Sequence, residues 1–94
     1  MYLEIVTPEE VVFQSEVEAV KVPGADGEFQ MLNNHAPIVS TLTAGTVKIN
    51  LSSSGEGKSP KLSADFEQQG NELFYPIKGG VLEMKDNKII ILAD

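Results

Sequence analysis

Residues Gly79 to Asp94 read "GGVLEMKDNKIIILAD", two short apolar runs separated by Asp86 and Asn87. Each run has the length of a β-strand and contains side chains that favour strands. Asp and Asn adopt positive φ at a lower cost than most other residues, so this pair favours a two-residue hairpin turn. The sequence therefore predicts two adjacent antiparallel strands, at residues 80–85 and 88–93.

The same pattern continues toward the N-terminus. Runs of Val, Ile, Leu, Phe and Tyr are separated by Gly, Pro, Asn or Asp every ~8 to 12 residues, a spacing typical of an antiparallel sandwich or barrel. No stretch requires a helix. We expect an all-β fold with about nine strands, at residues 2–6, 10–13, 17–22, 28–32, 38–41, 45–51, 72–78, 80–85 and 88–93.

Residues 52–71, "SSSGEGKSPKLSADFEQQGN", interrupt this pattern with a polar stretch that contains three glycines and one proline. The composition predicts a long flexible hairpin loop. Within it, "GEGKS" partly matches a phosphate-binding loop, but that motif needs a further glycine upstream and a helix after the lysine. Ser52 and Pro60 stand at those places. We therefore expect no nucleotide site.

Length and composition predict a single domain over residues 1–94. The chain has 94 residues, 41% of them apolar, which is enough for one small core. It has no cysteine, and its longest apolar run, Ile89 to Ala93, is far shorter than the ~20 residues that span a membrane. The first residues show no signal-peptide pattern, so we expect a cytoplasmic domain.

The charge of the chain argues against several classes of partner. The net charge is −7, and residues 1–47 hold seven acids but only one lysine. Nucleic acids and anionic lipid head groups attract clustered Lys or Arg that displace their counterions. The chain has no arginine, the side chain best shaped to bind carboxylate or phosphate in a forked geometry. We expect no nucleic acid among its partners.

His35 is the only histidine and lies in "GEFQMLNNHAP", residues 27–37. A metal site needs several ligands, and catalysis by an imidazole needs a nucleophile within reach and a group that orients the ring. Neither stands next to His35 in the sequence, so only other loops could supply them. We predict no catalytic residue, metal or cofactor. The surrounding Gly, Pro and Asn residues predict two turns that flank a short strand.

The residues between these turns combine an acid with apolar side chains. Glu28 begins the short strand, and Phe29, Met31 and His35 follow within the same excursion. An acid beside exposed apolar side chains predicts a contact surface for another macromolecule. The alternative is that Glu28 is a solvated carboxylate at a turn.

Several segments of the chain resemble one known family. Residues 22–49, "VPGADGEFQMLNNHAPIVSTLTAGTVKI", resemble the signature region of the epsilon subunit of F-type ATP synthases, in which Gly-Glu and an apolar stretch precede Pro-Gly-His-Ala-Pro. "GGVLEM" and "ILAD" near the C-terminal end, and the opening "LEIVTPEEVVFQSEVEAVKVPG", resemble further segments of that family. The resemblance implies the family's N-terminal domain, a ten-stranded flattened β-sandwich or barrel of two antiparallel sheets.

The chain departs from the family pattern at several places. Gln30 replaces a glycine, and Asn33-Asn34 replace the Pro-Gly before the histidine. We expect Asn34 to adopt the left-handed conformation of the missing glycine and Gln30 to need no special backbone. Residues 52–71 are longer than the usual hairpin loop. The sequence ends at Asp94, where typical members continue into a two-helix domain, so we expect a short form without the C-terminal helical domain.

The resemblance implies a non-catalytic subunit of the central stalk, which couples the ion-driven rotation of the c-subunit ring to the gamma subunit during ATP synthesis. Gamma and the c ring would be its partners, at the cytoplasmic face of the bacterial inner membrane, with membrane contact only through the complex. Carried over by position, the c-ring interface comprises Glu28, Phe29, Gln30, Met31, Leu32, Asn33 and Asn34. The gamma interface comprises His35, Ile38, Thr41, Gly79 and Gly80.

The resemblance also implies different roles within this ring interface. Glu28 would steer docking onto the polar loop of the c subunit, which bears basic residues in the family. Phe29 and Met31 would provide apolar anchors.

Two alternatives come from other classes of protein. "VLEMKDNKI", residues 81–89, resembles the biotinyl or lipoyl carrier domain, whose modified lysine lies beside methionine at a hairpin tip; Lys85 would be that lysine. Here Asp86 and Asn87 occupy the tip, and no second methionine follows Lys85. An unspecialised β ligand-binding module would need a deep apolar pocket, which a core of this size hardly provides.

Overall fold

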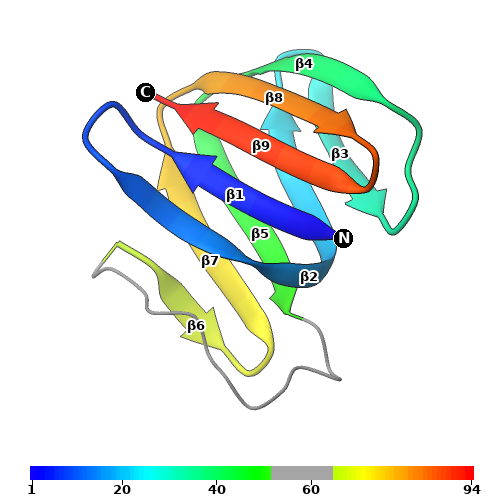
Figure 1. The fold of residues 1–94 in the computed structure, drawn as a ribbon. Coiled ribbons are helices and arrows are strands. Elements are labelled where there is room, and N and C mark those ends of the chain that lie inside the picture. Colours follow the sequence, from blue (N-terminus) through cyan, green and yellow to red (C-terminus); the bar gives the residue numbers. More distant parts are fainter. Residues whose placement is uncertain (52–64) are drawn as a thin grey trace.

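The computed structural model describes residues 1–51 and 65–94, and these residues form strands and no helix (Figure 1). The all-β prediction is confirmed. Nine strands lie in the described residues, where the family resemblance implied ten. They are β1 (Tyr2–Val6), β2 (Val11–Gly24), β3 (Gly27–Leu32), β4 (Ile38–Leu42), β5 (Gly45–Leu51), β6 (Glu67–Gln69), β7 (Glu72–Ile77), β8 (Gly80–Lys85) and β9 (Lys88–Ala93).

The strands form one continuous hydrogen-bonded sheet that folds over into two layers (Figure 1). Their order is β1-β9-β8-β4-β2-β5-β7-β6, and β3 pairs with β2 beside this path. A further pairing of β1 with β2 closes the first part of this order into a flattened barrel. Neighbouring strands run antiparallel, with the exception of β1 and β9, which are parallel.

The long strand β2 connects the two layers. Its first half pairs with β1, from Val11 to Glu16, and its second half pairs with β3 and β5. The prediction of two separate strands here is wrong, because the polar residues 14–16 continue the backbone ladder with β1 instead of forming a turn. A register shift between Val17 and Ala19 bends the strand as it passes from one layer to the other.

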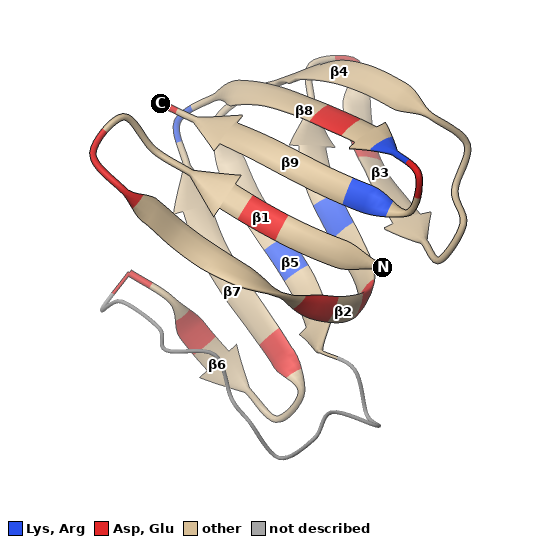
Figure 2. Ribbon diagram, viewed as in Figure 1, with Lys and Arg blue, Asp and Glu red and all other residues tan. Residues whose placement is uncertain are grey.

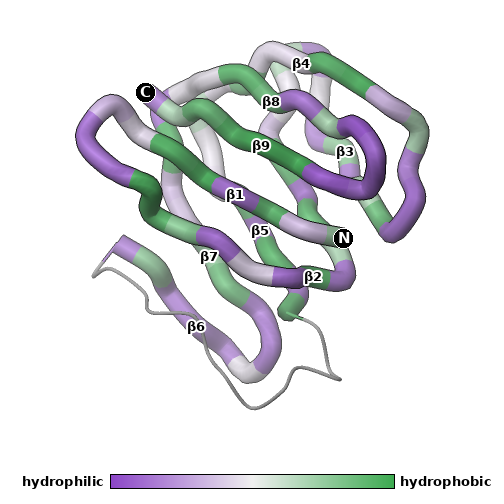
Figure 3. The backbone as a smooth tube through the Cα atoms, in the orientation of Figure 1, coloured by the Kyte–Doolittle hydropathy of each residue, from purple (hydrophilic) through white to green (hydrophobic). Residues whose placement is uncertain are grey.

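The core lies between the layers and is entirely apolar among the described residues. Strand alternation accounts for it: in β9, Ile89 and Ile91 point inward, whereas Leu92 points outward. Figure 3 shows β9 as a mainly apolar strand, and two of its outward residues, Ile90 and Leu92, are apolar as well. The side chains without any exposed surface include Leu3, Ile5, Val20, Val22, Met31, Val47, Ile49, Leu73, Leu82, Ile89 and Ile91.

A short strand lies within the stretch predicted as a hairpin loop over residues 52–71. β6 pairs with β7, with Glu67 opposite Phe74 and Gln69 opposite Glu72. Its three residues are all polar and exposed, so no apolar alternation indicates a strand, and the pairing rests on backbone hydrogen bonds. Residues 52–64 of that predicted loop lie outside the described residues.

Phe66 attaches the start of this segment to the core. Its ring centroid lies 4.6 Å from that of Tyr75 on β7 and 5.8 Å from that of Phe13 on β2. Aromatic pairs at such separations add about 0.5–1.5 kcal/mol to the effect of burial alone. Phe66 therefore covers one end of the space between the layers.

The two predicted asparagine turns are confirmed. Asp86 and Asn87 have φ of 52° and 61° and join β8 to β9, with Lys85 paired to Lys88. Two consecutive residues with positive φ are the signature of the hairpin turn that fits the twist of the flanking strands. Asn34 has φ of 62°, which is the left-handed conformation expected where the family has glycine.

Candidate docking surfaces

The first candidate surface is the loop that follows β3, residues 32–36, called here the docking loop. β3 pairs with β2 alone among the described strands, and the two are joined by a turn at residues 24–27. Glu28, at the start of β3, is exposed, and its carboxylate lies 3.3 Å from the Lys21 ammonium on β2. An ion pair this exposed contributes about 0–1 kcal/mol, so Glu28 is not needed for folding.

The structure separates the residues predicted to form the c-ring interface into two sets. Strand alternation directs Glu28, Gln30 and Leu32 to solvent, together with the loop residues Asn33 and Asn34. Leu32 is 57% exposed, so it is the large apolar side chain that this part of the surface presents.

Two of the seven point the other way. Met31 is completely buried in the core, so the prediction that it provides an exposed apolar anchor is wrong. Phe29 is half-buried and packs against the core. The two residues are two positions apart on one short strand, so both occupy its inward face.

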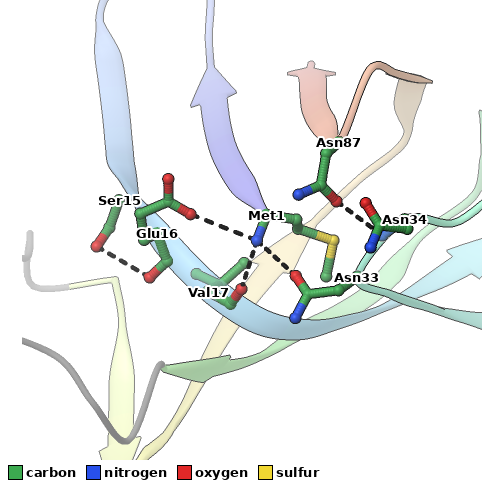
Figure 4. Close-up of polar contacts among 7 residues, drawn as sticks. All are labelled: Met1, Ser15, Glu16, Val17, Asn33, Asn34 and Asn87. Atoms are coloured by element: carbon green, nitrogen blue, oxygen red, sulfur yellow. Dashed lines mark hydrogen bonds and ion pairs between the residues drawn. The ribbon is translucent and has the colours of Figure 1, made fainter.

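Hydrogen bonds hold the docking loop on two sides (Figure 4). The Asn33 Oδ1 accepts a hydrogen bond from the α-amino group of Met1 at 2.6 Å, and the Asn34 backbone N–H donates to Asn87 Oδ1 at 2.8 Å. Within the loop, the His35 N–H donates to the Leu32 carbonyl at 3.2 Å, which closes a four-residue turn. The same α-amino group donates to the Val17 carbonyl and lies 3.4 Å from a Glu16 carboxylate oxygen.

The His35 ring is exposed, and its Nδ1 lies 2.7 Å from the carbonyl oxygen of Ala36. Within residues 1–51 and 65–94, the His, Asp and Glu side chains do not form a group of three that could hold a metal ion. A cavity of about 640 Å³ lies beside the loop. Its lining is mixed rather than apolar and comprises Met1, Glu16, Val17, Glu18, Ala19, Gln30, Leu32, Asn33 and Asn50.

The second candidate surface is a row of exposed apolar side chains on the outer face of the layer that contains β1, β9, β8 and β4. We call it the apolar stripe, and it consists of Val6, Val11, Val39, Val81 and Leu92. Val11, Val39, Val81 and Leu92 are 44–71% exposed, and Val6 is half-buried. Single exposed apolar residues are ordinary, whereas a contiguous row indicates an interaction site.

The strand register shows that the stripe is contiguous. Val6 lies opposite Val11 on one side and Leu92 on the other. Leu92 in turn lies opposite Val81. Directly opposed residues of one face have Cβ atoms about 4.5–5.5 Å apart, so these four side chains are close neighbours.

The far end of the stripe lies on β4. Val81 is opposite Thr41, and Val39, two residues before Thr41 on the same face of β4, is opposite Glu83 and diagonal to Val81. Figure 2 shows the charged residues of β8 and β9 in the halves of these strands nearer to the turn that joins them, and Val81 and Leu92 belong to the other halves. The two ends of this hairpin therefore differ in character, one apolar and one charged.

The residues predicted to form the gamma interface are placed unevenly. Thr41 is exposed within the stripe and His35 is exposed in the docking loop, whereas Ile38 is half-buried and packs against the core. Gly79 precedes β8 and Gly80 begins it, and a Cβ at Gly80 would collide with the Leu92 carbonyl oxygen, so Gly80 has a structural reason to be glycine. The sequence-based prediction of interface residues did not include the apolar stripe. The signal that could have indicated it is the presence of apolar residues at outward positions of strands, namely Val6, Val11, Val39, Val81 and Leu92.

The family model for the β-sandwich domain of the ATP synthase delta/epsilon chain matches residues 1–59. Over 98% of its length, the chain is 35% identical to the ATP synthase epsilon chain of Chlorobium limicola, of which it covers 86%. The chain belongs to the ATP synthase epsilon-chain family. Epsilon chains are non-catalytic subunits. Membership of this family argues against the alternative of a carrier domain modified at Lys85.

Other epsilon chains in the family are longer than this sequence. The chain is 40% identical to that of Desulforamulus reducens and 34% identical to that of Pelotomaculum thermopropionicum, each over 98% of this chain. It spans 57% and 56% of these relatives, a little more than half of their length.

Two solved structures contain chains with the same fold. A chain in the central stalk/c-ring structure of the Tetrahymena thermophila mitochondrial ATP synthase superposes with a TM-score of 0.69 at 16% identity, covering 99% of this chain and 62% of that one. A chain in the OSCP/F1/c-ring structure of the Euglena gracilis enzyme gives 0.70 at 21% identity, covering 97% and 48%. No helix in the described residues is long and apolar enough to cross a membrane.

Proposed function

We propose that this chain couples rotation of the c ring to the gamma subunit, as a non-catalytic part of the central stalk of an F-type ATP synthase. Membership of the epsilon-chain family supports this role. The observation that carries it is the pair of unlike surfaces on one small rigid domain, namely the apolar stripe and the polar docking loop. A subunit that transmits torque needs two such surfaces, one for each neighbour.

The apolar stripe is the proposed gamma interface. Four of its side chains are large and exposed, and Thr41 lies directly opposite Val81. Burial of such a row against a partner removes apolar surface from water, which contributes about 25 cal/mol per Å² of area. Of the residues that the resemblance assigns to the gamma interface, Thr41 lies in this face. His35 lies in the docking loop, shortly before β4 begins in the chain.

The docking loop and the outward residues of β3 are the proposed c-ring interface. Glu28, Gln30, Leu32, Asn33 and Asn34 are exposed there. Polar loops of c subunits in this family carry basic residues, so the Glu28 carboxylate would steer and register docking more than strengthen it. Leu32 takes the anchoring role that the sequence argument gave to Phe29 and Met31.

The proposal requires no chemistry from this chain. It assigns no catalytic residue, metal, nucleotide or other cofactor, because its role is to bind two partners and remain rigid between them. The expected location is the cytoplasmic face of the bacterial inner membrane, with the membrane reached only through the complex.

Size-exclusion co-elution with the gamma subunit of the same organism tests the proposal. We expect the wild-type chain to co-elute with gamma as a one-to-one complex. Val81→Lys places a charge in the stripe at an already exposed position and should abolish co-elution. Thr46→Lys, on an exposed position of β5 in the other layer, is the matched control and should co-elute normally. Separate elution of wild-type chain and gamma, both shown to be folded, would refute the proposal.

A further inference from the structure

The turn between β8 and β9 is in direct contact with the docking loop. The Asn34 backbone N–H donates to Asn87 Oδ1 at 2.8 Å, between residues 53 positions apart in the chain (Figure 4). The carbonyl oxygen of Asn87 also accepts a hydrogen bond from the Tyr2 N–H at 3.1 Å. Asn87 therefore binds the loop through its side chain and β1 through its backbone.

The geometry of both turns prepares this contact. Asn87 has φ of 61° in a two-residue hairpin turn, and Asn34 has φ of 62° in the turn from Leu32 to His35. The hydrogen bond that closes the loop turn uses the His35 N–H and leaves the Asn34 N–H to another acceptor. Asn87 is that acceptor, and it approaches from the tip of a hairpin whose backbone is paired along its length.

We propose that Asn87 is a positioning residue for the c-ring interface. Its amide oxygen holds the Asn33–Asn34 peptide in one orientation, so that Leu32, Asn33 and Asn34 face the ring in a fixed arrangement before docking. A loop ordered in advance loses less entropy on binding, and this raises its affinity. The proposal rests on the ring-docking function proposed above for this loop.

The same hairpin extends from the loop to the apolar stripe. Its tip, at Asp86 and Asn87, contacts the docking loop, while Val81 and Leu92 near its other end belong to the stripe. The β8–β9 hairpin is therefore a rigid link between the two surfaces. A displacement imposed on the loop by the ring would reach the gamma face along two paired strands.

Asn87 is also a favoured residue for a positive-φ turn, and the test must separate the two roles. Asn87→Gly removes the amide but preserves the turn, because Asp-Gly is among the preferred pairs for such hairpins and glycine adopts positive φ freely. Asn87→Asp retains an acceptor oxygen at the same place and also tolerates positive φ. If Asn87 served only the turn, glycine would be at least as good as asparagine.

The experiment measures exchange of the Asn34 amide proton by NMR on the whole chain, together with chemical unfolding. In Asn87→Gly we expect the Asn34 amide proton to exchange about threefold to tenfold faster, because one hydrogen bond is lost. Resistance to unfolding should be unchanged or increased. Asn87→Asp should exchange at close to the wild-type rate. Unchanged Asn34 exchange in Asn87→Gly, or equal acceleration in Asn87→Asp, would overturn the positioning role.

Binding to a purified complex of gamma and the c ring supplies the functional measurement. We expect Asn87→Gly to bind about threefold to tenfold more weakly than wild type, although it folds as well. Faster exchange of the Asn34 amide without any loss of affinity would overturn the role in docking. If the wild-type chain itself did not bind, the ring-docking function would fail, and the exchange rates would still show whether Asn87 holds the loop.

Discussion

Met31 and Leu32 are consecutive residues with opposite environments, and this difference can be measured. Met31 has no exposed surface, whereas Leu32 is 57% exposed. We expect Met31→Ala to lower the free energy of unfolding by about 2–5 kcal/mol, because it removes buried methylene and sulfur atoms and leaves a cavity. Leu32→Ala should change it by less than about 0.5 kcal/mol. Denaturant unfolding followed by circular dichroism distinguishes them, and equal losses in both variants would contradict the assigned environments.

Glu28 is predicted to act on docking and not on folding. Glu28→Lys reverses the charge that faces the basic loop of the c subunit, so we expect weaker binding to a gamma–c-ring complex, by a margin that shrinks as added salt screens the charges. The free energy of unfolding should change by less than about 1 kcal/mol, because the Lys21–Glu28 pair is exposed.

Two further variants isolate the intermolecular effect of Glu28. Glu67→Lys makes the same charge change on the exposed edge strand β6 and should bind normally. Exchanging the charges, with Lys21→Glu and Glu28→Lys together, restores an ion pair within the chain but leaves position 28 positive, so binding should remain weak. Recovery of full affinity in the exchanged variant would mean that the internal pair, not contact with the ring, is what matters.

At the scale of elements, Tyr75 on β7 makes the fold sensitive to alkaline pH. Burial raises the pKa of the Tyr75 phenol above its ordinary value of 10.0, and the carboxylates of Asp65, Glu10 and Glu9 raise it further. Between the unfolded and folded pKa values, the folded chain retains a proton that the unfolded chain has lost. This contribution to stability is therefore complete below pH 10 and disappears as the pH rises through the folded pKa.

We expect the free energy of unfolding to decline less steeply above pH 10 in Tyr75→Phe than in the wild-type chain. Phenylalanine retains the ring that stacks on Phe66 but has no proton to lose. Chemical unfolding at a series of pH values from 8 to 11.5 would show the difference in the slope of the unfolding free energy against pH. The lysines also titrate in this range, but they contribute equally to both proteins. Parallel curves throughout this range would mean that Tyr75 ionises in the same way in both states.

The elements differ in how well the sequence predicts them, and the reason is physical. The β8–β9 hairpin was predicted with its correct bounds because apolar runs and an Asp-Asn turn both signal it. β2 was divided in two because residues 14–16 are polar, although their backbone pairs continuously with β1. β6 was missed because three exposed polar residues give no periodic signal. The local pattern of apolar and polar residues indicates which side chains are buried. Strand pairing also depends on backbone partners that are distant in the sequence.

The same limit applies to the candidate surfaces. The docking loop was found because its turn chemistry and family resemblance are local features of residues 27–37. The apolar stripe was not, since Val6, Val11, Val81 and Leu92 come together only through the pairing of four strands. An inward or outward assignment for Met31 likewise required the register of β3 against β2. Composition cannot supply either kind of information.

At the scale of the whole molecule, the two surfaces occupy different parts of one small barrel. The stripe crosses the outer face of one layer, and the docking loop lies beyond the end of β3, at the tip of the β8–β9 hairpin (Figure 1). No residue belongs to both the stripe and the set of outward residues proposed for the ring. A shared core joins them, so each surface can bind its partner while the barrel transmits force between the two.

This separation leads to a last prediction. Because Glu28 and Val81 lie on separate proposed surfaces, we expect Glu28→Lys to bind isolated gamma with a Kd within about twofold of wild type, while Val81→Lys binds at least about tenfold more weakly. For the gamma–c-ring complex, both variants should bind more weakly, and the binding free energy lost in the double variant should equal the sum of the single losses within about 0.5 kcal/mol. Isothermal titration calorimetry with each partner provides these values. If Glu28→Lys weakened binding to isolated gamma as much as Val81→Lys does, both residues would belong to one interface, and the chain would clasp gamma instead of linking gamma to the ring.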